Sequence, residues 1–321
     1  MLILSQESVD QAVSLTDVMD AVELAYRLYD EEQFHMDART HMSCDENTLL
    51  LMPCAASDSI GTKIVTVFPN NETHPVTQGL MLLTDRTTGE AKALLNGTYL
   101  TGLRTGALGG LAARYLSPRS ASSLGLIGTG VQGFYQLLAI SEVRPIEHIY
   151  LFNRTKERAA TFKQEIQSRL PTHVNIHVAD SPEQVTRHSD IIVTATTSET
   201  PVLPNERHMY NSKTIIAVGS FQPHMRELPD ELFKQADYLF IDTLDAMQET
   251  GDVITPIKNQ WIHKSQCIPF SSIVAGHVSV SASKDRPVIF KSTGMALFDV
   301  IAAQTIYEKA VRQGAGQTIS L

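Results

Sequence analysis

The spacing of apolar residues changes along the chain, and this change predicts two kinds of architecture. Apolar positions recur at helical spacing over residues 14–34, and shorter strand-like runs follow, as is typical of an antiparallel sheet. A segment rich in small residues predicts a helix over 98–116. The strands of this N-terminal part are expected near residues 38–43, 48–54, 60–68, 80–83 and 91–95.

From residue 123 onward, apolar runs alternate with helical segments such as 155–169. This order is typical of a doubly wound, Rossmann-type α/β sheet. A final amphipathic helix is predicted over 293–312. The strands of this second part are expected near residues 124–127, 148–152, 174–178, 190–194, 214–218 and 237–241.

Composition and charge narrow the function classes. The chain has 321 residues, 43% of them hydrophobic and 19% charged, as in an ordinary globular protein of about two domains. A net charge of −9 without a basic block argues against nucleic-acid or membrane partners, and no apolar run approaches the roughly 20 residues of a membrane helix. Three cysteines without a CxxC motif favour a reducing, cytoplasmic setting. The 11 histidines show no metal-ligand spacing, so no metal site is expected.

A glycine-rich turn carries the strongest functional signal. Gly128, Gly130 and Gly133 follow a short apolar strand and precede a helical segment, which is the order that a dinucleotide pyrophosphate site requires. The next strand ends at Asn153, 20 residues beyond Gly133, where an NAD enzyme usually carries a carboxylate. Arg154 follows instead, so the site favours NADP(H), with NAD(H) expected to bind more weakly. The alternative is a glycine turn followed by a surface arginine.

Two cations occupy positions where apolar residues are expected. Strand alternation places Lys63 on one face with Val65 and Val67, so it needs either an anionic partner or a route to water at the strand's start. Arg104 shares a helical stripe with Leu100 and other apolar residues in a glycine-rich segment. It is either a clamp for a substrate carboxylate or a structural salt bridge.

Several of these motifs share one family pattern. These motifs cover residues 61–66, 101–107, 128–132, 217–228 and 290–296, together with Asp299. On the basis of these motifs, the chain resembles the ornithine cyclodeaminase/mu-crystallin family, and the resemblance extends over nearly the whole chain. The resemblance implies a substrate-binding and dimerisation domain of residues 1–117 and 293–321, and a Rossmann NADP(H)-binding domain of residues 118–292. It also implies a homodimer.

The resemblance assigns site residues as well. Arg39, Lys63 and Arg104 would hold the substrate carboxylate, with Lys63 and Arg104 as catalytic candidates, and Thr293 would line the substrate pocket. The stretch that begins at Asn153 resembles the mu-crystallin form of an NADPH clamp. The candidate cofactor-binding residues are Thr105, Gly128, Thr129, Gly130, Val131, Gln132, Asn153, Arg154, Thr155, Ala195, Thr196, Thr197, Val218, Gly219 and Ser220.

One departure from the family pattern bears on the chemistry. Cyclodeaminases carry a proton-relaying aspartate at the position that Phe221 occupies here, and phenylalanine cannot act as an acid or base. We therefore expect an NADPH-dependent reductase of cyclic α-imino acids, which makes L-proline from Δ1-pyrroline-2-carboxylate and L-pipecolate from Δ1-piperideine-2-carboxylate. One alternative is an ornithine cyclodeaminase or an alanine dehydrogenase-like enzyme, which would need another acid/base such as His224. The other is a non-enzymatic protein of mu-crystallin type that binds NADPH and a small ligand.

Overall fold

The computed structural model describes residues 1–279 and 285–320, and the chain divides into two compact units. The first unit comprises Met1–Arg104 and Met295–Leu321, and the second comprises Thr105–Gly294. The first division falls inside helix α3 (Gly97–Leu116), earlier than the expected boundary at residue 117. The reason is packing, because the second half of α3 contacts α4 (Val131–Val143): the Gln136 Nε2 atom donates a hydrogen bond to the Thr105 carbonyl.

The first unit is built on an eight-stranded mixed sheet. Its strands follow the order β16-β1-β7-β6-β5-β4-β2, with β3 paired to β4, and only β1 and β7 run parallel. The short strands β1, β2 and β16 carry too few residues to show an alternating pattern, and the sequence did not predict them. The strands are β1 Leu2–Leu4, β2 Phe34–Met36, β3 Thr40–Cys44, β4 Asn47–Ala56, β5 Ser59–Val67, β6 Thr77–Asp85, β7 Ala91–Asn96 and β16 Gln317–Thr318.

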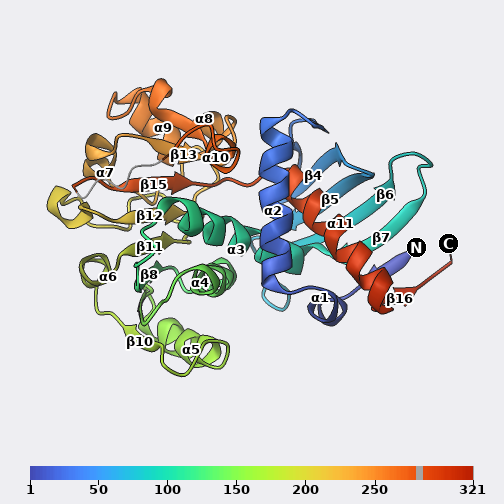
Figure 1. Ribbon diagram of the computed structural model, residues 1–321, viewed down its shortest axis with the longest axis horizontal. Helices are drawn as coiled ribbons and strands as arrows, with labels where there is room; N and C mark the ends of the chain where they lie inside the picture. The colour runs from blue at the N-terminus through green and yellow to red at the C-terminus, as the bar shows by residue number, and fades with distance from the viewer. Residues whose placement is uncertain (280–284, 321) are drawn as a thin grey trace. The chain divides into compact units, whose positions relative to one another are not determined.

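Helices α2 (Leu15–Asp30) and α11 (Ala296–Gln313) lie side by side over one face of this sheet, and α1 (Gln6–Ala12) packs against α11 (Figure 1). A reciprocal capping box between Ser14 and Asp17 starts α2. The approach of α11 to β5 depends on Gly61, where a Cβ atom would lie 2.5 Å from the Val300 Cγ2 atom. This close contact brings the first turn of α11 onto the strand that carries Lys63.

The second unit is a doubly wound parallel sheet with the strand order β10-β9-β8-β11-β12-β15-β13-β14. The order reverses between β8 and β11, and in such sheets ligands bind at the carboxyl ends of the strands beside this point. The predicted α/β fold class with a Rossmann sheet is confirmed. The strands are β8 Ser123–Ile127, β9 His148–Phe152, β10 Asn175–Val178, β11 Ile191–Thr194, β12 Thr214–Ala217, β13 Leu239–Ile241, β14 Cys267–Pro269 and β15 Val288–Lys291.

Helices cover both faces of this sheet. A Cβ atom on Gly125 would meet Val185 of α6, whereas the next residue, Leu126, faces Gly133 of α4. The sequence predicted the start of the last helix at residue 293, but Val288–Lys291 is a buried strand and the helix begins at Ala296. The remaining helices are α5 Lys156–Gln167, α6 Pro182–His188, η1 Arg207–Tyr210, α7 Asp230–Gln235, α8 Ala246–Glu249, α9 Gly251–Lys258, η2 Lys264–Gln266 and α10 Phe270–Val274.

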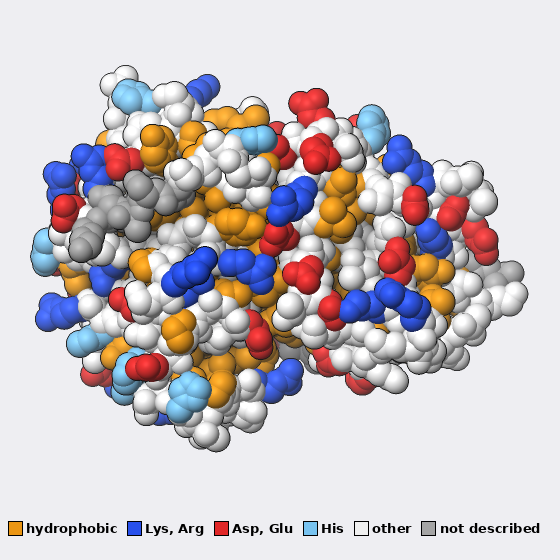
Figure 2. Space-filling model, in the orientation of Figure 1, with side chains coloured by type: hydrophobic (Ala, Val, Ile, Leu, Met, Phe, Trp, Pro, Cys, Tyr) orange, Lys and Arg blue, Asp and Glu red, His pale blue; other side chains and the backbone are white. Residues whose placement is uncertain are grey.

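Charged side chains of both signs lie on the surface of the molecule (Figure 2). On the face drawn in Figure 2, basic and acidic side chains are interspersed rather than gathered by sign. No helix in the described part of the chain has both the length and the apolar character that crossing a bilayer requires.

Candidate active site

Lys63 and Arg104 share one buried carboxylate in the first unit. The Lys63 Nζ atom donates to Asp299 Oδ2 at 2.7 Å, and the Arg104 Nε atom donates to Asp299 Oδ1 at 3.0 Å. These side chains come from β5, α3 and α11, and their residues are 2%, 7% and 0% exposed. Lys63 therefore has the anionic partner that its strand position requires and does not reach water at the strand's start. Arg104 forms a salt bridge with Asp299, which is one of the two roles that the sequence predicted for it.

The electrostatics of this cluster favour a further anion. Burial opposes ionisation of Asp299, but the charges of Arg104 and Lys63 outweigh it and hold the pKa of Asp299 below its usual value. Burial lowers the pKa of Lys63 to about 8; Asp299 opposes this change, whereas the charges of Arg104 and of half-buried Arg39 add to it. The structure thus brings the three predicted cations into one electrostatic neighbourhood. Asp299 is shared by Lys63 and Arg104, so this pair of cations keeps an excess of positive charge.

The glycine-rich turn of the second unit has the features of a pyrophosphate site. Gly128 has φ +99°, and a Cβ atom there would lie 2.5 Å from the carbonyl oxygen of Ala195. A Cβ atom on Gly130, in contrast, would meet no heavy atom within 4 Å, so this side of the turn is open. Gly130 begins α4 without a side-chain cap, and the first backbone N–H groups of the helix suit an anion. The residues present therefore fit a dinucleotide.

Asn153 connects the end of β9 to this turn. Its Nδ2 atom donates to the Thr129 Oγ1 atom at 2.7 Å, and its Oδ1 atom accepts from the Thr155 N–H at 3.0 Å. Arg154 is exposed beside it. An amide and an arginine at this position can accept the extra phosphate of NADP(H), whereas a carboxylate would repel it.

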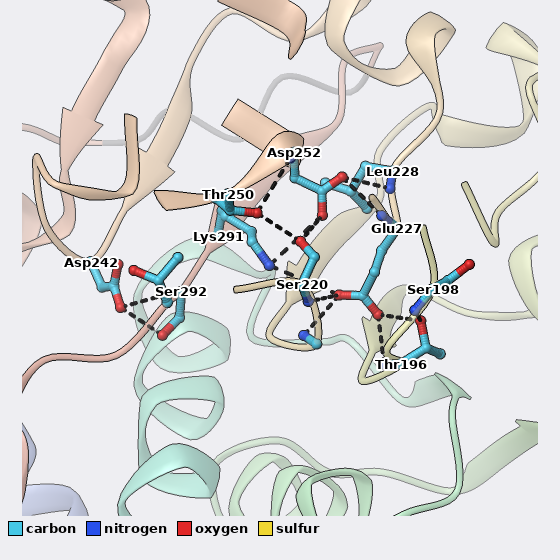
Figure 3. A network of polar contacts seen from close by, with 12 residues as sticks. Thr196, Ser198, Ser220, Glu227, Leu228, Asp242, Thr250, Asp252, Lys291 and Ser292 are labelled. Carbon is cyan, nitrogen blue, oxygen red and sulfur yellow. Dashed lines mark hydrogen bonds and ion pairs between the residues drawn. The ribbon is translucent and has the colours of Figure 1, made fainter. Parts of the chain in front are cut away.

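The predicted residues after β11 and β12 are held by a glutamate to which the sequence analysis gave no role. Thr196, Gly219 and Ser220 all donate hydrogen bonds to Glu227 (Figure 3). Glu227 lies within a matching family motif, but its partners are up to 31 residues away in the sequence. Nothing in the local pattern predicts such contacts.

The segment before α11 is held by a buried carboxylate. The backbone N–H groups of Thr293 and Gly294 donate to Asp242 Oδ2 at 2.9 and 2.6 Å. Ser292 donates to the same oxygen (Figure 3). The buried Thr293 Oγ1 atom has no hydrogen-bond partner among the residues that the structure describes, so this hydroxyl can still serve a ligand.

Phe221 and His224 both face solvent. Phe221, which follows the end of β12, is 43% exposed. The His224 Nε2 atom lies 4.0 Å from Glu199 Oε1, and both side chains are largely exposed. An exposed ion pair of this kind holds the two side chains only weakly in position, whereas the buried hydrogen bonds of Asp299 fix Lys63 and Arg104.

A Rossmann sheet with this turn, and a separate unit with buried cations, define a dinucleotide-dependent oxidoreductase of small acids. The chain is 36% identical to a Delta(1)-pyrroline-2-carboxylate reductase from Bacillus cereus, over 99% of both chains. The chain belongs to the ornithine cyclodeaminase/mu-crystallin family, whose pattern matches residues 1–314.

Two solved structures are similar over nearly the whole chain. One is the Thermococcus litoralis Delta(1)-pyrroline-2-carboxylate reductase in complex with NADH and L-proline, with a TM-score of 0.92 and 30% identity over 99% of this chain and 100% of that one. The other is an archaeal alanine dehydrogenase dimer with bound NAD, with a TM-score of 0.92 and 31% identity over 100% and 99%. The family and the enzyme class predicted from the sequence, an NAD(P)H-dependent oxidoreductase acting on CH–NH or C=N bonds, are confirmed.

Proposed function

We propose that this enzyme is an NADPH-dependent reductase of cyclic α-imino acids that converts Δ1-pyrroline-2-carboxylate to L-proline and Δ1-piperideine-2-carboxylate to L-pipecolate. The observation that carries the proposal is the buried pair of cations, Lys63 and Arg104, that shares a single carboxylate. The similarity to the Bacillus cereus reductase supports the same reaction. Phe221, which offers no acid or base, favours reduction of a ready-made imine over deamination.

In this proposal the first unit binds and orients the substrate. Arg104 reaches Asp299 through Nε, and we expect its two terminal nitrogens to take the substrate carboxylate, with Lys63 and Arg39 assisting. Asp299 fixes both cations, so the substrate is held in one orientation. The chemistry that NADPH would supply when bound is the hydride for the imine carbon. The ring nitrogen of the substrate enters the site protonated. Lys63, with its pKa of about 8, can hold or orient a water molecule that returns a proton to this nitrogen if the nitrogen loses one.

The cofactor residues that we propose lie in the second unit. Residues 128–132 would take the pyrophosphate, and residues 153–155 would take the 2′-phosphate of NADPH, with NADH as a weaker alternative. Residues 195–197 and 218–220 would hold the nicotinamide half, Thr105 would lie beside it, and Thr293 would offer its hydroxyl to the substrate. The three free cysteines fit a reducing compartment, and we place the enzyme in the cytoplasm.

The cofactor proposal makes a prediction at Arg154. Replacing this arginine by alanine removes a charged hydrogen-bond donor to phosphate, which is worth about 1.5–3 kcal/mol. We expect Arg154→Ala to lower kcat/KM for NADPH by roughly 10-fold or more and to leave kcat/KM for NADH nearly unchanged. Steady-state kinetics with both cofactors measure this. Equal losses with both cofactors would remove Arg154 from the 2′-phosphate site.

A second candidate function is amino-acid dehydrogenation, favoured by the similarity to an archaeal alanine dehydrogenase. The test of both functions is one assay panel. Oxidation of NADPH and of NADH is followed with each cyclic imine and with pyruvate plus ammonia, and ammonia release is followed with L-ornithine and the oxidised cofactor. We expect fast oxidation with the cyclic imines and no ammonia release from ornithine. Turnover with pyruvate and ammonia alone would establish the second function, and turnover with none would reject both.

The cation cluster makes its own prediction. Arg104→Ala should raise the KM for the imine by roughly 100-fold, because a buried charge pair that loses one partner costs about 2–5 kcal/mol. Lys63→Ala should mainly lower kcat, because the carboxylate keeps Arg104. Lys309→Ala is the matched control, since it removes an ion pair with Asp17 in the same unit but outside the cluster. Wild-type kcat/KM in both cluster variants would show that the site is assigned wrongly.

A further inference from the structure

A buried network of charged and hydroxyl side chains lies at the carboxyl ends of β11, β12 and β15 in the second unit (Figure 3). Glu227, Asp252 and Lys291 are all fully buried, and so are Ser220 and Thr250. Burying three charges is costly, because each loses its hydration. Neither the cation cluster nor the substrate proposal uses this network, so its cost calls for another explanation.

Glu227 joins two strand ends through both of its carboxylate oxygens. Its Oε1 atom accepts from the N–H and Oγ1 of Thr196, at 2.7 and 2.9 Å. Its Oε2 atom accepts from the N–H groups of Gly219 and Ser220, at 2.8 and 3.0 Å. Thr196 follows β11, and Gly219 and Ser220 follow β12. Only a carboxylate can accept on both sides in this way.

Asp252 and Lys291 hold Glu227 in turn. Asp252 Oδ1 accepts from the N–H groups of Glu227 and Leu228, at 2.9 and 3.0 Å, and its Oδ2 accepts from Ser220 Oγ at 2.5 Å. Lys291 Nζ lies 3.9 Å from Glu227 Oε2 and 3.7 Å from Asp252 Oδ2. Burial raises the pKa of Glu227, and the charge of Lys291 opposes this rise. The ammonium group thus offsets part of the cost of two buried carboxylates.

The ends of β11 and β12 are packed so closely that neither can shift relative to the other. A Cβ atom on Gly219 would lie 2.2 Å from the backbone N and O atoms of Thr196 and 2.5 Å from Glu227 Oε1. Backbone atoms cannot move aside as a flexible side chain can. The glutamate and the glycine together fix the relative position of residues 195–197 and 218–220.

We propose that Glu227 is a positioning residue that sets the orientation of the nicotinamide half of the dinucleotide through the ends of β11 and β12. This inference rests on the proposed role of those strand ends in binding the nicotinamide. Glu227 is fully buried, and it would act through the residues that donate to it, Thr196, Gly219 and Ser220. The hydrogen bonds that Glu227 accepts come from the ends of β11 and β12 and not from the glycine-rich turn, so it governs how the ring is held more than how tightly the whole cofactor binds.

The test is Glu227→Gln, which keeps the shape of the side chain but turns one oxygen into an NH2 group that faces N–H donors. Three quantities are measured: the Kd of NADPH, the emission spectrum of the bound reduced nicotinamide, and kcat with its primary deuterium isotope effect on the cyclic imine. We expect Kd to change by less than about 3-fold, because the turn at residues 128–133 is untouched. We expect a shifted emission spectrum, a loss in kcat of roughly 10-fold or more, and a larger isotope effect as hydride transfer becomes slower.

Asp190→Asn is the matched control. Asp190 Oδ2 accepts from the N–H groups of Ser122 and Ser123 and from Ser123 Oγ, so it joins β8 to β11 in the same manner at their amino ends. We expect this variant to lose thermal stability while keeping the wild-type emission spectrum, kcat and isotope effect. If both variants change these readouts alike, or if neither changes them, Glu227 has no positioning role.

Two further outcomes keep the inference separate from the proposed function. If the wild type binds NADPH but turns over no imine, the proposed function fails, and the emission spectrum alone decides the role of Glu227. If Glu227→Gln does not fold, Glu227→Asp replaces it, and the same shift in emission at nearly constant Kd is expected. An unshifted spectrum in a folded variant overturns the inference.

Discussion

At the scale of single residues, the chemistry of the site depends on one carboxylate that serves two cations. Asp299 neutralises only part of the charge of Lys63 and Arg104, so the cluster can accept a second carboxylate without a further counter-ion. Lys63 is also the one cation of the cluster whose charge changes near physiological pH, since burial lowers its pKa to about 8. The affinity of the cluster for an anion should therefore depend on pH.

The pH prediction uses a ligand with no titratable nitrogen. Cyclopentanecarboxylate is a ring carboxylate of the substrate's size, and its inhibition constant reports on the cations alone. We expect this constant to rise as the pH increases through about 8, because Lys63 loses its charge there. Lys63→Arg should remove the dependence between pH 7 and about 10, because arginine stays protonated. A wild-type inhibition constant that is flat over this range would contradict the role of Lys63.

The same pKa has a consequence for stability, with a defined sign. Lys63 titrates near 8 in the folded protein and at its ordinary value of 10.5 in the unfolded chain. Between these values the unfolded chain binds the proton that the folded protein has released, so the contribution of Lys63 to the free energy of unfolding increases with pH. Below pH 8 the cost of its buried charge is present in full.

At the scale of elements, apolar runs predicted some segments well and others poorly. The strand at 148–152 was predicted with its observed bounds, because a buried parallel strand is a continuous apolar run between polar turns. The strand at 288–291 was not predicted, because the sequence analysis recognised only the periodic segment that follows it and placed a helix there from residue 293. Lys63 and Arg104 were found as cations on apolar stripes. Their partnership was not predictable, because Lys63 and Asp299 are 236 residues apart.

The contact between β5 and α11 makes an element-scale prediction. In Gly61→Ala the new methyl group would meet Met81 Cε, which can move, and Val300 Cγ2, which is held by a branched side chain on α11. We expect a loss of about 1–3 kcal/mol in stability and weaker binding of cyclopentanecarboxylate, because Asp299 precedes Val300 on the helix. Thermal unfolding and inhibition constants measure both effects.

The compensating variant for this prediction is Gly61→Ala with Val300→Ala. Removing the two γ-methyl groups of Val300 makes room for the new methyl at residue 61, so the double variant should recover most of the inhibitor affinity. Its stability should recover less, because a buried valine has been truncated. If the single variant binds the inhibitor as the wild type does, β5 and α11 are not packed as closely as the structure indicates.

At the scale of the whole molecule, the first sheet has one covered face and one half-exposed apolar face. Met52, Lys63 and Met81 are paired across three strands and lie on the covered face, as does Gly61 beside α11. Their neighbours Leu51, Ile64 and Leu80 are paired in the same way and point to the other face, where Leu80 is 39% exposed. We propose that this face joins two copies of this chain, because an interface would bury the apolar side chains that three neighbouring strands leave partly exposed.

The dimer prediction is tested by placing a charge on that face. Leu80→Glu would put two carboxylates into a two-fold interface, where unpaired charges cost several kcal/mol each. We expect the wild type to have the mass of a dimer in light scattering, and Leu80→Glu to shift toward the 35.4 kDa of one chain. Leu24→Glu is the control, because Leu24 is a 45% exposed leucine on α2, which covers the opposite face. A wild type with the mass of one chain would refute the dimer, and a Leu80→Glu variant that remains dimeric would move the interface away from this sheet.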